Sequence, residues 1–390
     1  MADLSIHGPK RRHHVVMLVR NAYTHDTRVE KEARTLLAAG HRVTVVADSG
    51  PGLPEHEGRD GYQVVRVPRV GPAVPGLRYV LHEWRLSRRL VAQRPTVLHA
   101  HDSNALIPVA LAAAKQRIPF VYDAHELWLG RPRRDRSRLY FALSQAWYRV
   151  VERWTIPRAS AVLTVSPPIA GRLRRRYGLA EVHLVANYPD RRRPVERREI
   201  RDLPGGEAID QELPVVLYLG GLMRGRGIEG LVEAMGMIPD AQLVSLGEGP
   251  LLEPLRASAL AAGARATFLP PVPPDLVNDY AASATVGVSP YVPEGLNNRY
   301  SLPNKLFHYM AAGIPVLASA FPQVRAIVEG VRCGVTVDMT APTAIATAIR
   351  RVLRDPAEAA AMGARGRAAV EDRYNWEASA AVLQAVYEDL

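Results

Sequence analysis

The chain has 390 residues, of which 47% are hydrophobic, and its formal net charge is +11 with a sequence pI near 9.9. This length suits two domains better than one, and no apolar run approaches the roughly 18–20 residues that a membrane-spanning helix requires. The single cysteine, Cys333, excludes an internal disulfide and fits a reducing cytoplasm, so we expect it to be a small core residue. The apolar run after the basic N-terminus is too short for a secretory signal, and we therefore expect a cytoplasmic protein.

The positive charge is carried mostly by arginine, with runs at 131–138, 172–176, 191–193 and 197–201. Such an excess can attract an anionic membrane surface, phosphate-bearing substrates or nucleic acid, and it is also compatible with an ordinary solvated surface. No segment resembles a nucleic-acid-binding module such as a zinc finger or an aromatic RNP strand. We therefore expect an anionic lipid surface or a phosphorylated substrate as partner, and no nucleic acid.

Residues 14–190 alternate short strand-like runs with longer helical runs, which is the pattern of a doubly wound sheet. The expected strands are 14–19, 42–46, 63–67, 96–99, 120–122, 162–165 and 183–185. The expected helices include 28–39, 105–115, 139–154 and 168–177. We therefore predict an N-terminal α/β domain over residues 1–190.

Polar residues follow several of these strands, at the sheet edge where α/β ligand sites gather. In the first loop, Asp26 or Thr27 can cap the helix that follows, and Arg28 begins that helix. His125 comes directly after the strand 120–122. A single histidine in such a place is more often structural, and a functional role is the alternative.

The strand at 96–99 leads into a second polar group, His99-Ala100-His101-Asp102. Two histidines and an aspartate can suggest a metal site, but no third or fourth ligand at a useful spacing accompanies them. We therefore interpret His101 and Asp102 as hydrogen-bonding residues and expect no metal here.

The expected helix 139–154 carries an apolar stripe of Leu139, Leu143, Trp147, Val151 and Trp154, preceded by five arginines among residues 131–138. A basic, aromatic amphipathic segment can lie on an anionic membrane surface. Such a stripe more often packs on its own sheet, and we prefer that interpretation.

Residues 191–212 are charged and interrupted by proline and glycine, as in a linker. The α/β alternation then restarts, which predicts a second domain over 213–375 and a last helix over 376–390. The expected strands are 215–219, 242–246, 266–269, 286–289, 314–318 and 332–337. The expected helices include 228–237, 251–262, 276–282, 342–353 and 356–370.

Two glycine-rich turns follow strands of this second half. Gly220 and Gly221 let the backbone approach a ligand, and Arg224 and Arg226 can clamp a diphosphate beside it. A second turn holds Gly247 and Glu248. By themselves both turns are also compatible with ordinary strand–helix connections.

The stretch 294–319, EGLNNRYSLPNKLFHYMAAGIPVLAS, reads as a polar loop, a short helix ended by Gly313 and a buried strand. Leu306, Tyr309 and Met310 form the apolar face of the helix. Asn304 and Lys305 stand at its start, where free backbone N–H groups can form an anion site. By itself this geometry is more typical of an ordinary loop and helix in an α/β domain.

Residues 303–319, PNKLFHYMAAGIPVLAS, closely resemble the donor-site segment of the family-4 retaining glycosyltransferases, which have the two-lobed GT-B fold. The resemblance covers nearly the whole chain in order. It implies two Rossmann-like doubly wound domains facing each other across a cleft, a nucleotide-sugar held mainly by the second domain and an acceptor bound by the first. The last helix would cross back onto the first domain.

The resemblance also implies roles for single residues. The donor would be held by a set spread over the two glycine turns and the stretch 294–308: Gly220, Gly221, Gly247, Glu248, Glu294, Tyr300, Ser301, Leu302, Asn304, Lys305 and His308. The family has glutamates where this chain has Tyr300 and His308, and Glu294 can supply the missing sugar contact. Catalysis would rest on His125 near the transferred sugar and on Arg224 and Arg226 at the diphosphate. The acceptor would meet Asp26, Thr27, Arg28, His101 and Asp102.

We therefore predict a metal-independent, retaining glycosyltransferase that needs no cofactor and acts on a hydroxyl acceptor such as a glycan, a lipid-linked glycan or a secondary metabolite. It would be cytoplasmic, with the basic N-terminal domain able to lie on the inner face of the membrane. The chain has no Asp-x-Asp pair for a metal-bound diphosphate, so arginines and helix N-termini would stabilise the leaving group. Two alternatives are a nucleotide-sugar epimerase of the same fold and a basic binding protein whose donor site has decayed.

Overall fold

The computed structural model describes residues 11–69, 75–133, 137–191 and 198–390. The described chain divides into two compact units. Unit 1 comprises the residues up to Asn187 together with Ser379–Leu390, and unit 2 comprises Tyr188–Ala378. The expected boundary lay at 190, and the N-terminal leader and part of the arginine runs fall outside the described residues.

Unit 1 is built on an eight-stranded sheet of order β3-β4-β2-β1-β5-β6-β7-β8, parallel except for the edge strand β3. Its strands are β1 (His14–Leu18), β2 (Arg42–Asp48), β3 (His56–Arg59), β4 (Tyr62–Val67), β5 (Val97–His101), β6 (Phe120–Ala124), β7 (Ala161–Thr164) and β8 (His183–Leu184). The central strands are buried along their length, because helices cover both faces of a parallel sheet.

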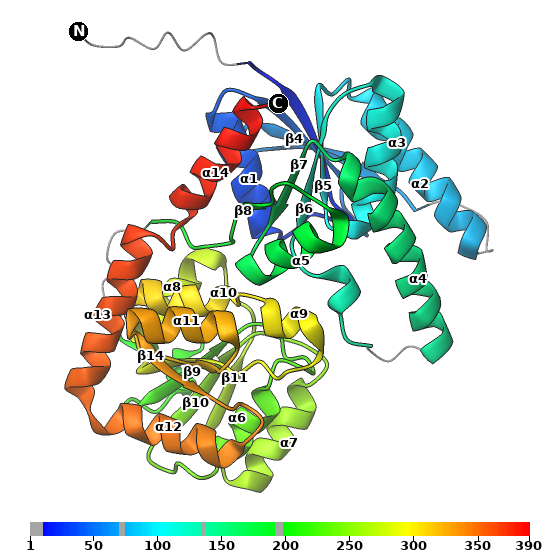
Figure 1. The fold of residues 1–390 in the computed structure, drawn as a ribbon. Helices are drawn as coiled ribbons and strands as arrows, with labels where there is room; N and C mark the ends of the chain where they lie inside the picture. Colours follow the sequence, from blue (N-terminus) through cyan, green and yellow to red (C-terminus); the bar gives the residue numbers. More distant parts are fainter. Residues whose placement is uncertain (1–10, 70–74, 134–136, 192–197) are drawn as a thin grey trace, which may run out of the picture. The chain divides into compact units, whose positions relative to one another are not determined.

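The helices of unit 1 are α1 (Thr27–Ala38), α2 (Pro75–Ala92), α3 (Leu106–Gln116), α4 (Arg138–Thr155) and α5 (Pro167–Tyr177). In Figure 1, α2, α3 and α4 lie on one face of the sheet and α1 lies on the other. The C-terminal helix α14 (Trp376–Glu388) has most of its residues in unit 1, where Tyr387 is hydrogen-bonded to His99 of β5 at 2.9 Å. Helix α2 and strand β3 were not among the expected elements.

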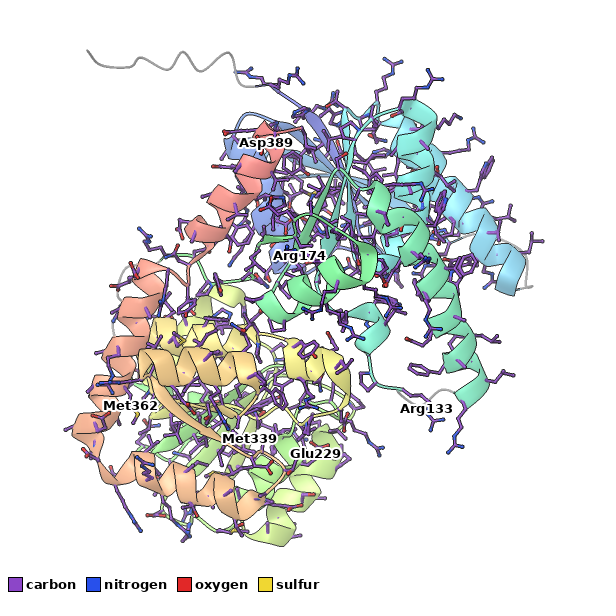
Figure 2. The ribbon with its side chains drawn as sticks, in the orientation of Figure 1. Arg133, Arg174, Glu229, Met339, Met362 and Asp389 are labelled. Carbon is purple, nitrogen blue, oxygen red and sulfur yellow. The ribbon has the colours of Figure 1, made fainter. Side chains whose placement is uncertain are left out.

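Helix α4 differs from the packed helix that we preferred. Of the predicted stripe only Val151 is buried, whereas Leu139, Leu143, Trp147 and Trp154 are 43–70% exposed. Figure 2 shows side chains standing out along the helix, with Arg133 just before it. The packing interpretation of the stripe is therefore wrong for four of its five residues.

Unit 2 is built on a six-stranded parallel sheet of order β11-β10-β9-β12-β13-β14. Its strands are β9 (Val215–Leu219), β10 (Gln242–Leu246), β11 (Ala266–Leu269), β12 (Val286–Ser289), β13 (Val316–Ser319) and β14 (Gly334–Val337). Its helices are α6 (Ile228–Met235), α7 (Leu252–Ala262), α8 (Pro274–Ser283), α9 (Gly295–Tyr300), α10 (Asn304–Ala312), α11 (Pro322–Val331), α12 (Pro342–Arg354) and α13 (Pro356–Asp372).

The core of unit 2 has one apolar cluster on each face of the sheet, as expected of strands buried on both sides. Helices α6, α7 and α12 supply one cluster, and α8, α10, α11 and α13 supply the other. Ile200, Leu203 and Ile209 belong to the second cluster, so part of the segment expected as a linker is core of unit 2. Cys333 is fully buried in the second cluster and its thiol donates to the Val328 carbonyl, which confirms the expected core role.

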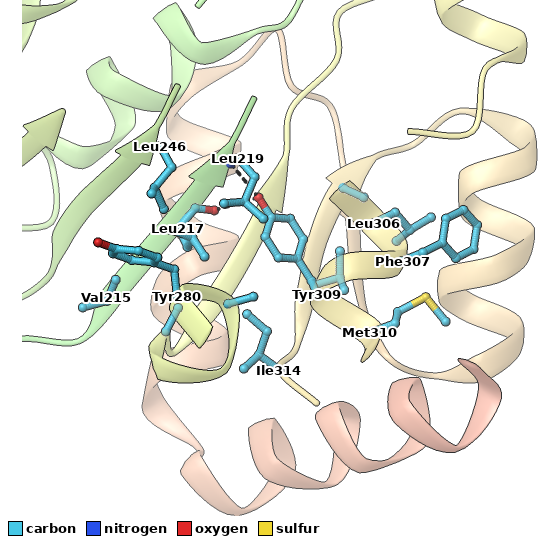
Figure 3. Close-up of a cluster of buried hydrophobic side chains, with 14 of the residues drawn as sticks. Val215, Leu217, Leu219, Leu246, Tyr280, Leu306, Phe307, Tyr309, Met310 and Ile314 are labelled. Atoms are coloured by element: carbon cyan, nitrogen blue, oxygen red, sulfur yellow. Dashed lines mark hydrogen bonds between the residues drawn. The ribbon is translucent and has the colours of Figure 1, made fainter. Parts of the chain in front are cut away.

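Helix α10 is fixed to the sheet by its predicted apolar face, since Leu306, Tyr309 and Met310 are all fully buried. Figure 3 shows Tyr309 directed at β9, where its hydroxyl accepts a hydrogen bond from the Leu219 N–H at 3.0 Å. A Cβ at Gly287 of β12 would lie 2.2 Å from the Tyr309 ring, so glycine is required there. Gly313 ends the helix in the left-handed conformation, as expected. The start of α10 is thereby held at the carboxyl ends of β9 and β12.

Candidate functional site

Two polar clusters lie at the carboxyl edges of the two sheets, one in each unit. In unit 2, Leu219 and Leu246 are register partners, which sets the turn after β9 beside the turn after β10. A Cβ at Gly247, whose φ is +149°, would lie 2.2 Å from the Gly220 carbonyl oxygen. The Gly220 N–H donates to Leu246 O at 2.9 Å, and the Leu222 N–H donates to Glu248 O at 2.9 Å. The two turns thus form one surface of closely packed backbone, as the glycines predicted.

Lys305, the second residue of α10, extends beneath these turns. Its Nζ lies 3.7 Å from the centre of the Tyr218 ring and 5.4 Å from that of Tyr291. The Arg226 guanidinium lies 4.7 Å from the centre of the same Tyr291 ring. The structure therefore brings two predicted donor-site cations together through aromatic rings.

The ammonium of Lys305 is buried and makes no hydrogen bond within the described residues. Burial lowers its pKa well below the usual value, and the nearby Arg226 lowers it further. A buried donor group without an acceptor costs free energy. An anionic ligand beside Gly220, where a Cβ would be 3.6 Å from Nζ, would remove that cost.

Other predicted donor residues lie on the glycine turns and beside Gly225. Arg224, Gly221 and Glu248 are exposed on the turns. Asn298, which we did not predict, donates from Nδ2 to the carbonyls of Gly225 and Val292, each at 3.2 Å. The Glu294 carboxylate lies against Gly225, since a Cβ there would be 2.5 Å from Oε2.

The remaining predicted donor residues are not all gathered around Lys305. The His308 imidazole faces α8, where Nδ1 is 3.3 Å from Asn278 Oδ1. Leu302 packs against the core, and Ser301 Oγ donates to the Asn298 carbonyl at 3.1 Å. Asn304 is exposed at the first position of α10, and Tyr300 ends α9 half-buried. The imidazole of His308 thus already has an internal partner at the position where the family has its glutamate.

In unit 1 the cluster centres on His125. Strand pairing sets His101 beside Asp123, and the chain then turns at His125. His125 Nε2 lies 2.9 Å from Asp123 Oδ2 and 3.1 Å from His101 Nδ1. The Asp102 carboxylate accepts a hydrogen bond from the backbone N–H of His125 at 3.1 Å, and it lies 3.8 Å from the ring nitrogen Nδ1. Carboxylates therefore flank both nitrogens of this imidazole.

These neighbours change the protonation of the cluster. Burial acts to lower the pKa of His125, but Asp102 and then Asp123 raise it to about 9. Burial raises the pKa of Asp102 to about 6. Burial would also raise the pKa of Asp123, but Arg28 and His125 hold it well below its usual range. At neutral pH the arrangement therefore favours a charged imidazolium at His125.

The acceptor role predicted for Arg28 is not supported by its surroundings. Its Nε and Nη2 donate to the two oxygens of Asp123 at 2.8 and 2.7 Å, and Nη1 donates to Val185 O at 2.6 Å. Nε also lies 3.1 Å from Glu32 Oε1. Because the guanidinium is buried and bonded inside the protein, Arg28 positions Asp123 rather than contacting a substrate.

His101 is likewise buried among His99, Asp123 and His125, which leaves it no exposed surface for an acceptor. Asp26 caps α1 by accepting the Val29 N–H at 3.3 Å, so the predicted cap is confirmed. Thr27 is exposed at the first helical position. Asp26 and Thr27 stay candidates for the acceptor.

The expectation that no third or fourth ligand accompanies the two histidines is wrong. Within the described ranges, Glu32 of α1 and Asp123 of β6 join His99 and His101, and one possible ligand atom of each lies within 4.8 Å of the others. These residues could hold a metal ion. Arg28 already contacts both carboxylates, so the group also has an internal counter-charge without a metal.

Sequence reasoning missed several residues of both clusters. Glu32 lies four residues after Arg28 on one helix face, and this i,i+4 spacing was a usable signal. Tyr218 and Tyr291 sit inside or after expected strands, where aromatic residues usually indicate only core. No signal pointed to the Asp123–Arg28 pair, whose members are 95 residues apart in the chain.

Two family descriptions match the chain. Glycosyltransferase Family 4 matches residues 26–193, and Glycosyl transferases group 1 matches residues 213–355. The first match contains the His125 cluster, and the second contains the glycine turns and Lys305.

Two characterised relatives align over most of the chain. One is the GDP-mannose-dependent alpha-(1-6)-phosphatidylinositol monomannoside mannosyltransferase of Mycolicibacterium smegmatis, 27% identical over 89% of this chain and 90% of that protein. Another is the 2-deoxystreptamine glucosyltransferase of Streptomyces kanamyceticus, 25% identical over 91% of this chain and 96% of that protein.

Solved structures resemble the chain over nearly its full length. Sucrose-phosphate synthase of Thermosynechococcus elongatus aligns with a TM-score of 0.76 and 23% identity over 97% of this chain and 99% of that chain. Anabaena HepE in complex with UDP-glucose aligns with a TM-score of 0.77 and 16% identity over 97% of this chain and 100% of that chain. At these identities the likeness establishes the fold.

Proposed function

We propose that this chain, which belongs to the family-4, group 1 glycosyltransferases and has their GT-B fold, transfers a sugar with retention of configuration and without a metal ion. The chain is a glycosyltransferase that uses a nucleotide-sugar donor. We therefore prefer this activity to the two alternatives, a nucleotide-sugar epimerase and a binding protein with a decayed donor site. No cofactor is part of the proposal.

The proposed reaction takes place on one face of the sugar ring. The bond between the anomeric carbon and the phosphate oxygen breaks, and the acceptor hydroxyl oxygen forms its bond to that carbon from the same side. The acceptor proton passes to the leaving diphosphate. Negative charge therefore grows on the diphosphate in the transition state, where a fixed cation is most effective.

The observation that carries the proposal is the stack of Lys305 and Arg226 around the Tyr291 ring beneath the glycine turns. The buried amino group of Lys305 has no hydrogen-bond acceptor among the described residues, and a diphosphate beside it would favour its charged form. Exposed Arg224 on the turn after β9 can add a second cation. Together with the N–H groups at the start of α10, these residues offer the charge that a metal ion would otherwise supply.

We assign His125 the role of orienting and stabilising the donor sugar, as the family resemblance implies. The flanking Asp102 and Asp123 support this role, because they keep the imidazole charged and fix its two nitrogens. Nε2 is engaged by Asp123 at 2.9 Å, so Nδ1, which lies 3.8 Å from Asp102, is the nitrogen that would donate to a sugar hydroxyl.

For the acceptor we propose a hydroxyl compound at an anionic membrane surface. On α4, Leu139, Leu143, Trp147, Val150 and Trp154 are 43–70% exposed. The charged side chains on the exposed part of this helix are arginines, and its one acidic residue, Glu152, is buried. An apolar, tryptophan-bearing face among arginines suits lipid head groups, and the name of the mycobacterial relative includes a glycolipid acceptor. No described helix is long and apolar enough to cross a bilayer.

The proposal is tested by assaying donor turnover in the presence of EDTA and by determining the anomeric configuration of the product by NMR. We expect full activity without divalent cations and a product with the donor's configuration. Inverted product would refute retention, and activity that returns only with added Mg²⁺ would refute metal independence.

A further inference from the structure

A pocket of about 370 Å³ lies in unit 1, apart from the His125 cluster. Its lining includes three arginines, Arg20, Arg69 and Arg78, together with His82, Tyr79 and Tyr148. Among the described residues, none of those that line it carries a carboxylate. Guanidinium, imidazole and phenol groups around one hollow form a lining of hydrogen-bond donors, which suits an anion.

Two buried carboxylates hold this lining in place from behind. Asp48 Oδ1 lies 2.9 Å from His82 Nε2, and its Oδ2 accepts from Arg69 Nη2 at 2.5 Å. Glu83 accepts from Arg20 Nη1 at 2.7 Å. Arg20 and Arg69 are therefore preorganised, and with Arg78 they place three guanidinium groups around the pocket.

The pocket opens at the carboxyl edge of the sheet. Arg20 follows β1, and its Nη1 donates at 2.9 Å to the carbonyl of Asn104, which also lines the pocket. Asn104 is two residues after Asp102, whose carboxylate accepts the His125 N–H. This is the edge at which α/β domains bind their ligands.

The pocket also adjoins the apolar face of α2 and α4. The Tyr79 ring meets Trp147 edge-on at 6.3 Å, and Tyr148 lies 4.9 Å from Trp128. On α2, Leu77, Val80 and Trp84 are 51–61% exposed, like the side chains of α4. A ligand with an anionic group in the pocket can therefore lay an attached apolar chain along exposed hydrophobic side chains.

We propose that this pocket binds the phosphate of a lipid-linked acceptor, with the lipid chain on the α2 and α4 face. The inference rests on the proposed function, since it names the acceptor class of the same enzyme. The phosphate would be held by the arginines and the two tyrosines, and the hydroxyl to be glycosylated would belong to the head group beyond it.

Binding of three probes by calorimetry tests the proposal: inorganic phosphate, dihexanoylphosphatidic acid below its micelle concentration, and the zwitterionic dihexanoylphosphatidylcholine. We expect the anionic lipid to bind at least about tenfold more tightly than either other probe, because only this lipid offers both an exposed phosphate and apolar chains. The variant R69A/R78A should lose at least about tenfold in affinity for this lipid. The matched control R256A/R265A, with side chains 52% and 60% exposed against 59% for Arg69, should retain it.

A second variant separates the two parts of the site. Leu143→Glu on α4 should weaken the anionic lipid while leaving inorganic phosphate unchanged, and Leu260→Glu, 85% exposed in unit 2, should change neither. Equal affinity of wild type and R69A/R78A for the lipid overturns the proposal, as does inorganic phosphate bound as tightly as the lipid. If R69A/R78A does not fold, the single charge reversal Arg78→Glu answers the same question.

The thermal shift produced by the nucleotide-sugar, measured on the same variants, separates this inference from the proposed function. A retained donor shift with unchanged lipid affinity in R69A/R78A contradicts the pocket assignment alone. If the wild type binds the anionic lipid but no nucleotide-sugar raises its melting temperature, only the proposed donor site is contradicted.

Discussion

The two polar clusters of this chain differ in whether their buried cations have hydrogen-bond partners within the protein. In unit 1, Arg28 binds both oxygens of Asp123 and lies beside Glu32, and His125 is flanked by carboxylates. In unit 2, Lys305 has aromatic rings around its ammonium and no hydrogen-bond acceptor among the described residues. The Arg28 ion pairs are thus satisfied within unit 1, whereas the Lys305 amino group has no such partner among the described residues.

The difference indicates which motif residues build the site and which act on the substrate. A buried guanidinium that is hydrogen-bonded through Nε, Nη1 and Nη2 fixes geometry, whereas a buried ammonium without an acceptor is destabilising until an anion binds. Arg28 and Lys305 both come from recognisable motifs, but Arg28 holds the structure of its cluster and Lys305 is available to bind an anion. Stability and activity should consequently respond in opposite directions to substitutions in the two clusters.

Asp123→Asn should produce the largest loss of stability. It leaves the Arg28 guanidinium buried without its counter-charge, and breaking a buried ion pair costs about 3–5 kcal/mol. Urea unfolding measures the change. A loss below about 1 kcal/mol would show that Glu32 can replace Asp123 and that the cluster is less closed than its contacts indicate.

Lys305→Met should separate activity from stability. We expect kcat/KM to fall about 10²–10³-fold, the range for losing one fixed donor to developing negative charge. The free energy of unfolding should stay the same or rise, because methionine fills an aromatic environment without a buried charge. Steady-state kinetics and urea unfolding on the same preparation check both parts. An active Lys305→Met enzyme would remove the cation from the mechanism.

Stability should also depend on the protonation of His125. Its pKa is about 9 in the folded protein against 6.5 for the unconstrained side chain. Below pH 6.5 both folded and unfolded chains hold the proton, so its full contribution is present. Between pH 6.5 and about 9 only the folded chain holds it, and stability falls by up to about 1.4 kcal/mol per pH unit before the contribution is lost.

The comparison of wild type with His125→Asn isolates this proton from other titrations. The difference in unfolding free energy between the two should shrink from pH 6.5 to pH 9. A difference that is constant over this window would mean that Asp102 and Asp123 do not hold a charge on His125.

The smallest effect is expected for Arg34→Ala, which serves as the exposed counterpart of the Arg28 pair. Arg34 Nη2 lies 2.7 Å from Asp60 Oδ2, the same separation as between Arg28 and Asp123, but the side chains are 57% and 48% exposed. Exposed pairs contribute about 0–1 kcal/mol. A larger loss on urea unfolding would show that distance, rather than burial, controls these pairs.

Much of unit 2 could be predicted from the sequence because its signals are local. Strands β9, β10, β11 and β12 lie at the expected residues, since each is a short apolar run between turn residues. The stop of α10 at Gly313 and its apolar face followed from single positions. Turn and helix chemistry of this kind acts over a few residues, so it is visible without a fold.

Helix α2 was missed because polar residues interrupt its buried face. His82 and Glu83 are buried beside Leu86 and Leu90, so the apolar spacing of the helix is hidden. The exposure of α4 was predicted wrongly for the opposite reason. Its apolar stripe is regular, but a regular stripe does not show whether the protein's own core or another surface covers it. Contacts between distant segments, such as Arg28 with Asp123, depend on strand order and could not be read from spacing.

The central claim is that unit 2 holds a donor site that needs no metal, with Lys305 at its anionic end. Thermal unfolding with UDP-, GDP-, ADP- and dTDP-sugars, all in EDTA, tests it most directly, because a ligand that binds only the folded state raises its melting temperature. We predict a rise with one base class in wild type that is lost in Lys305→Met. No rise with any donor, or a rise that Lys305→Met retains in full, would contradict the account.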